Sequence, residues 1–115
     1  MAAAMADYEL KDNGDGQFSL SGEMTFDTAE RILAKSERPF EQHTRIEVDL
    51  SGVTQSDSAG LALLLEWVTW ANHTVREIRF TEIPARVMAI AKTTEVDELL
   101  TRGERWAGFI ESPGQ

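Results

Sequence analysis

The chain contains no cysteine and only two histidines among its 115 residues. Without cysteine it cannot build a disulfide, a thiolate nucleophile or a thiolate metal cluster, which fits a reducing compartment. The histidines, His43 and His73, do not stand at metal-ligand spacing from each other or from paired carboxylates. We therefore expect neither a metal nor another cofactor.

Long hydrophobic runs are also missing. The longest apolar stretch, 59–71, is interrupted by Glu66 and Thr69 and falls short of the roughly 20 residues that cross a bilayer. Residues 1–6 carry no positive charge and are too short for the apolar core of a secretory signal, so they predict a disordered N-terminus. We expect a soluble cytoplasmic protein that does not insert into a membrane directly.

Basic residues are few, with 11 Lys and Arg against 20 Asp and Glu, for a formal charge of −9. Such a surface repels nucleic-acid phosphates and anionic lipid headgroups. The sequence thus favours protein partners with basic or apolar surfaces over nucleic acid, although an acidic excess also serves solubility alone.

Motifs for catalysis are absent as well. The glycines form neither a Gly-x-Gly-x-x-Gly nor a P-loop pattern. A triad of Ser58, His73 and Asp57 cannot assemble, because His73 lies about four turns along the same predicted helix as Ser58. We expect no enzyme activity.

Four segments alternate between apolar and polar residues, which predicts strands with one buried face. Their apolar members are Tyr8 and Leu10; Phe18 and Leu20; Ile46, Val48 and Leu50; and Ile78 and Phe80. The first two strands flank Asn13-Gly14-Asp15-Gly16, a turn sequence typical of a hairpin.

Helical patterns follow the second, third and fourth strands. The first helix is expected to begin at Asp27, with Glu30 completing a capping box, and to end at Pro39. A strong helix is predicted over 58–72, and Pro84 opens another, with a short helix near its end. The apolar residues of the first helix are Phe26, Ala29, Ile32 and Leu33. Those of the helix after Pro84 are Val87, Ile90 and Ala91, and those of the last short helix are Val96, Leu99 and Leu100.

This order predicts an α/β domain over 7–111, followed by a tail over 112–115. Each later strand follows a crossover helix, so we expect a mixed sheet, with an antiparallel N-terminal hairpin beside parallel strands. Because the polar positions of the strands would line the opposite face, the helices should cover mainly one face.

The segment 49–65 is the most informative part of the chain. It predicts a strand end, an exposed turn and a helix start whose free backbone N–H groups attract negative charge. Ser56 or Asp57 is a natural cap, and Ser58 would expose its hydroxyl in the first turn. Capping alone would explain these residues, whereas a phosphate on Ser58 would change what can dock there.

The runs Asp49-Leu50-Ser51-Gly52-Val53 and Asp57-Ser58-Ala59-Gly60-Leu61 resemble the central signature of STAS domains, which include anti-sigma-factor antagonists and cytosolic domains of sulfate transporters. The similarity extends over about 18–100. It implies that Ser58 matches a regulatory serine or threonine, and that Asp57, Ser58 and Gly60 lie at a docking site. Many antagonists have a second serine where this chain has Ala59, and the run 59–65 is more similar to the MlaB group.

The MlaB group comprises the small STAS subunits of phospholipid-trafficking ABC systems. The resemblance implies a non-catalytic regulatory subunit that binds and stabilises an MlaF-like cytosolic ATPase. It would do so through the helix start Asp57-Ser58-Ala59-Gly60 and the neighbouring apolar face of the helix. This ATPase would work with a membrane permease at the Gram-negative inner membrane to maintain outer-membrane lipid asymmetry. The alternative is a phospho-switched anti-sigma-factor antagonist regulated at Ser58.

The helix after this motif has more apolar surface than one buried face needs. One arc, expected to face the sheet, contains Leu61, Leu64, Leu65, Val68 and Ala71, and the neighbouring arc contains Leu63, Trp67 and Trp70. The second arc predicts either a partner surface or packing beneath the C-terminal segment near Trp106 and Phe109.

Overall fold

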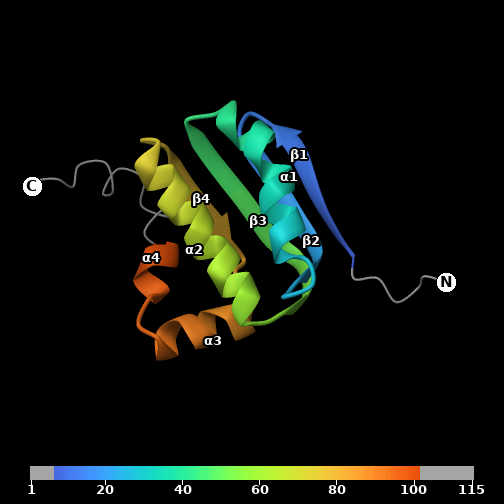
Figure 1. Ribbon diagram of the computed structural model, residues 1–115, viewed down its shortest axis with the longest axis vertical. Helices are drawn as coiled ribbons and strands as arrows, with labels where there is room; N and C mark the ends of the chain where they lie inside the picture. Colours follow the sequence, from blue (N-terminus) through green and yellow to red (C-terminus); the bar gives the residue numbers. More distant parts are fainter. Residues whose placement is uncertain (1–6, 102–115) are drawn as a thin grey trace, which may run out of the picture.

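A computed structural model describes residues 7–101, which form a four-stranded sheet and four helices (Figure 1). The elements in chain order are β1 (Tyr8–Gly14), β2 (Gln17–Met24), α1 (Ala29–Glu41), β3 (Arg45–Ser56), α2 (Ser58–His73), β4 (Glu77–Thr81), α3 (Ala85–Thr93) and α4 (Asp97–Thr101). The predictions for 1–6 and 112–115, and the part of the predicted domain over 102–111, lie outside the described residues.

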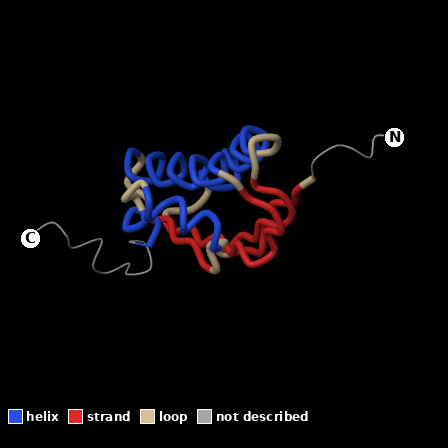
Figure 2. The backbone as a smooth tube through the Cα atoms, turned by 90° about the horizontal axis from the view of Figure 1, so that it is seen from below, coloured by secondary structure: helices blue, strands red, loops and turns tan. Residues whose placement is uncertain are grey.

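The strands follow the order β1-β2-β3-β4, with β1 antiparallel to β2 and the other two pairs parallel. Helices α1 and α2 each connect two parallel strands and lie on the same side of the sheet (Figures 1 and 2). The predicted α/β class, mixed sheet and one-sided helix layer are therefore confirmed.

The hairpin turn adopts the conformation that its glycines predict. Gly14, Asp15 and Gly16 all have positive φ, at 92°, 57° and 79°, a backbone region that glycine enters at little cost. Gly16 also has no room for a side chain, because a Cβ there would clash with the Arg45 carbonyl oxygen.

Strand β3 is longer than the alternation predicts. The segment 51–56, expected to be an exposed turn, instead continues the strand and pairs with β2, from Ser21 opposite Gly52 to Met24 opposite Ser56. The sequence of this segment does not alternate between apolar and polar residues, and its pairing register with β2 shifts twice, between Ser19 and Ser21 and between Gly22 and Glu23.

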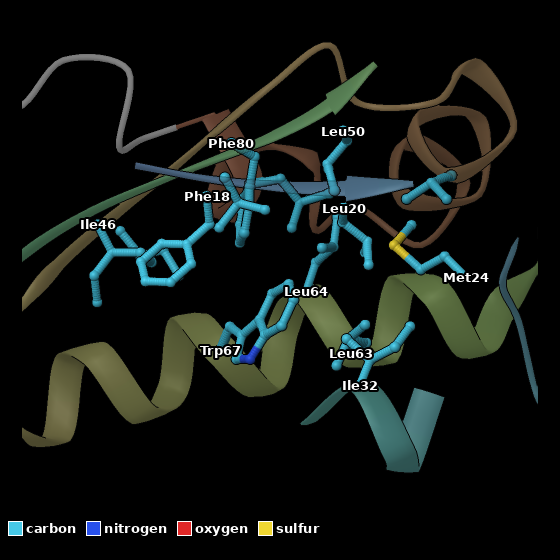
Figure 3. Close-up of a cluster of buried hydrophobic side chains, with 14 of the residues drawn as sticks. Phe18, Leu20, Met24, Ile32, Ile46, Leu50, Leu63, Leu64, Trp67 and Phe80 are labelled. Atoms are coloured by element: carbon cyan, nitrogen blue, oxygen red, sulfur yellow. The ribbon is translucent and has the colours of Figure 1, made fainter. Parts of the chain in front are cut away.

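The core lies between the sheet and its helix layer (Figure 3). All the predicted inward strand residues from Phe18 to Phe80 are buried, and Tyr8 and Leu10 of the edge strand are half-buried. Outward residues of β3 and β4 form two cross-strand ion pairs. Arg45 Nε lies 2.9 Å from Glu77 Oε1, and Arg79 Nη2 lies 3.5 Å from Glu47 Oε2. Both pairs remain partly exposed to solvent, and surface pairs contribute about 0.2–1 kcal/mol each.

Trp67 is the largest fully buried side chain. Its ring packs between Phe40 and Phe80, with centroid distances of 5.2 and 6.2 Å. Its indole N–H donates to Ser36 Oγ at 2.9 Å, and that hydroxyl donates to the Leu33 carbonyl at 2.7 Å. This chain of hydrogen bonds joins α2 to α1 inside the core and satisfies a polar group that would otherwise be costly to bury.

The boundaries of α1 differ from the prediction at both ends. Thr28, and not Asp27, is the N-cap, and its side chain makes no capping bond, so no Asp27–Glu30 capping box forms. Pro39 lies inside the helix, which continues to Glu41. Phe26, predicted in the buried stripe, precedes the helix and is 84% exposed, because helical spacing does not apply outside the helix.

Helix α2 approaches β2 closely at Gly60. A Cβ at this position would lie 2.6 Å from the Met24 carbonyl oxygen and 3.0 Å from Met24 Cε. Gly60 is therefore needed for packing, although glycine is a poor helix former.

We expect Ser36→Ala to lower the free energy of unfolding by about 1–3 kcal/mol, because the buried Trp67 indole loses its acceptor. Urea denaturation followed by circular dichroism measures this change. In a Trp67→Phe background, where no indole N–H remains, the same substitution should cost much less. Equal costs in the two backgrounds would contradict the role given to this hydrogen bond.

Gly60→Ala should destabilise the domain by about 1–3 kcal/mol through the overpacked contact with the Met24 carbonyl. Helix propensity alone predicts the opposite, a gain of up to about 1 kcal/mol. Thermal and urea denaturation distinguish the two results, and a more stable variant would show that the helix can move away from β2 without cost.

Candidate functional site

The candidate site lies where β2 and β3 end beside each other. Met24, the last residue of β2, pairs with Ser56, the last residue of β3. Parallel pairing therefore brings the loop before α1 next to the start of α2, although about 30 residues separate them in the chain.

Asp57 connects these two segments. Its Oδ1 accepts from the Ala59 N–H at 2.9 Å, which caps α2, and its Oδ2 accepts from the Phe26 N–H at 3.2 Å. The sequence leaves the cap open between Ser56 and Asp57, and the structure selects Asp57. Its second bond, to a residue on another loop, is visible only in the fold. One carboxylate thus fixes both the helix start and the neighbouring loop.

Two buried threonines shape that neighbouring loop. Thr28 Oγ1 accepts from the Thr25 N–H and donates to the Glu23 carbonyl, both at 2.9 Å. Because its hydroxyl is used in this way, Thr28 does not cap α1 with its side chain. The bonds hold the backbone around Phe26 with the phenyl ring outside the core, so this aromatic ring is exposed on an ordered loop.

Helical periodicity wrongly predicted that Phe26 lies in the buried stripe of α1. The spacing of Phe26, Ala29 and Leu33 matches a helical stripe, but the helix begins only at Ala29. The flanking threonines, Thr25 and Thr28, are the sequence signal that could have indicated a structured loop before the helix.

The predicted docking residues at the helix start are exposed to different degrees. Ser58 is exposed, Asp57 and Ala59 are half-buried, and Gly60 is buried against Met24. The accessible chemistry of this motif is therefore the Ser58 hydroxyl and the Ala59 methyl group, beside the Phe26 ring.

The predicted second arc of α2 is mostly inside the protein. Leu63 and Trp67 are 3% and 1% exposed, so the hypothesis that they belong to a partner surface is corrected. Both pack against α1, because Leu63 lies beside Ile32 (Figure 3) and Trp67 contacts Phe40 and Ser36. Trp70 is half-buried and keeps part of its ring accessible.

The candidate site presents a hydroxyl group, a methyl group and an aromatic ring. Ser58 and His73 lie at opposite ends of α2. Residues 7–101 contain no group of three or more His, Cys, Asp or Glu placed to hold a metal ion. No helix in the described part of the chain is long and apolar enough to cross a membrane.

Comparisons with known proteins agree with this geometry. Residues 10–101 match the family model described as "Mlab, STAS domain". The structure of the anti-sigma factor antagonist SpoIIAA in its unphosphorylated form is similar, with a TM-score of 0.63 and 15% identity over 95% of this chain and 100% of that chain. The NMR structure of the protein TM1081 is similar as well, with a TM-score of 0.64 and 16% identity over 94% and 90% of the two chains.

Identities this low make the two solved structures evidence for the fold alone. A search of curated proteins gave no match. The family model covers most of the chain and includes β2, β3 and the start of α2, where the candidate site lies. The chain belongs to the STAS-domain family.

Proposed function

We propose that the protein is a non-catalytic accessory subunit that binds the ATPase of a phospholipid-transport ABC complex. The start of α2 and the Phe26 loop form the docking surface. The protein would be cytoplasmic and held at the inner membrane through the ATPase and its permease, and ATP hydrolysis would belong to the partner.

The observation that carries the proposal is the exposed Phe26 ring on an ordered loop beside Ser58 and Ala59. Burying a large aromatic side chain is a common source of binding energy at protein interfaces. The loop is held by Asp57 and two threonines, so little conformational entropy is lost on binding. The MlaB description of the matching family favours a transport partner.

A regulatory role requires more than attachment. A bound subunit shifts the ATPase toward an active arrangement only if it binds that arrangement more tightly than the alternatives. A surface with few mobile parts suits this role, because it fits one geometry of the partner better than another.

The second candidate is an anti-sigma-factor antagonist switched by phosphorylation of Ser58. The exposed hydroxyl of Ser58 favours it, as does the similarity in fold to an antagonist solved in its unphosphorylated form. A phosphate there would lie near the free N–H groups of the α2 N-terminus but also near the Asp57 carboxylate.

Affinity purification of the tagged protein from its native cells separates the two functions. We expect an ABC ATPase and its permease to be recovered, and Phe26→Ala to reduce this recovery about tenfold or more, because an interface aromatic is lost. The matched control is Val75→Ala, which removes another exposed apolar side chain at the far end of α2. Recovery of a serine kinase with no transporter subunit would sink the transport proposal.

Substitutions of Ser58 test the chemistry of the docking surface. Ser58→Ala should weaken binding of the purified ATPase modestly, and Ser58→Asp more strongly, by placing a charge in an interface that excludes water. Isothermal titration calorimetry gives the affinities, and circular dichroism confirms folding. Unchanged affinity for Ser58→Asp would place the interface elsewhere on the domain.

A further inference from the structure

A groove runs between α1 and α2 on the outer side of the helix layer. It consists of two hollows of about 240 and 370 Å³ that share Leu33 and Glu66 in their lining. One hollow reaches Trp70 toward the end of α2, and the other reaches Phe26 and Ala59 at the candidate site. The groove therefore continues the proposed docking surface along the length of the helix pair.

The floor of the groove is apolar and already in place. Phe40 lies under Trp70, with ring centroids 6.1 Å apart. The Arg76 guanidinium lies 5.0 Å from the centroid of Trp70 and donates to the carbonyls of His43 and Glu41. Trp70 is thus held between two anchored groups, and a ligand would not have to order it first.

The rim of the groove is acidic. Glu30 and Glu37 lie on α1 and Glu66 on α2, and all three are exposed. No lysine or arginine lines either hollow. An anionic lipid or an acidic segment would be repelled here, whereas cationic side chains would complement both walls.

We propose that this groove takes a basic amphipathic segment of the protein partner, with apolar residues on the floor and lysine or arginine beside the three glutamates. A helix with apolar anchors at i, i+3, i+4 and i+7 suits an elongated groove of this kind. The inference rests on the proposed function, because the groove is continuous with the Phe26 and Ser58 surface, and it names the element of the partner that docks.

The test uses a fluorescein-labelled helical peptide with leucines at i, i+3, i+4 and i+7 and lysines at the flanking positions, and a second peptide with glutamates in place of the lysines. Fluorescence polarisation gives the dissociation constants with the full-length protein. We expect the lysine peptide to bind at least about tenfold more tightly than the glutamate peptide, with an affinity that falls as salt rises.

A charge reversal locates the site. Glu37→Lys combined with Glu66→Lys should weaken the lysine peptide about tenfold and strengthen the glutamate peptide. The matched control, Glu9→Lys with Glu98→Lys, makes the same change in net charge on β1 and α4, away from the groove. Equal losses in the two double variants would overturn the inference, because attraction to the net charge would then explain binding.

Binding of the purified ATPase distinguishes failure of this inference from failure of the proposed function. If Ser58→Asp abolishes ATPase binding while the Glu37/Glu66 reversal leaves it unchanged, the groove is not used and the proposed function stands. If no ATPase binds but the peptides follow the charge reversal, the groove inference stands for a different protein partner.

Discussion

The parallel pairing of β2 with β3 brings together the ends of two segments that are distant in the chain. Met24 and Ser56 are partners in the sheet, so the loop leading to α1 and the start of α2 emerge side by side. The pairing requires Gly52, where a Cβ would lie 2.8 Å from Ser21 Cβ. The close approach of α2 to β2 similarly requires Gly60. Without these contacts the site residues would not share one surface.

Asp57 links the start of α2 to the loop before α1 by hydrogen bonds. A carboxylate with two oxygens can accept from two backbone donors, one on its own helix and one on a neighbouring loop. The buried threonines of the loop complete the arrangement. Hydrogen bonds thus hold the backbone that carries the exposed Phe26 ring.

The two tryptophans of α2 differ in burial. Trp67 and Trp70 are three positions apart, so they lie on neighbouring parts of one helix face. Trp67 is buried between Phe40 of α1 and Phe80 of β4, whereas Trp70 is only half-buried. The same helix pair therefore forms the core below and an accessible groove above. The floor of this groove is apolar, and acidic side chains of α1 and α2 make its rim negatively charged.

Local patterns in the sequence were sufficient for much of the fold. Alternation identified the inward residues of all four strands, the Asn-Gly-Asp-Gly turn identified the hairpin, and the cap of α2 was narrowed to Ser56 or Asp57. These features depend on neighbours within a few residues, where period and backbone preference act directly. The motif around Ser58 also indicated the family from sequence alone.

Tertiary contacts decided the remainder. The extension of β3, the exposure of Phe26 and the burial of Trp67 each depend on an element that is distant in the chain, namely β2, Asp57 and α1. Helical or strand spacing indicates which residues share a face, but it does not indicate whether another element covers that face. The sequence by itself determined the order and type of the elements, the inward faces of the strands and the family motif; only the packed structure determined where α1 and β3 begin and end and which side chains are exposed.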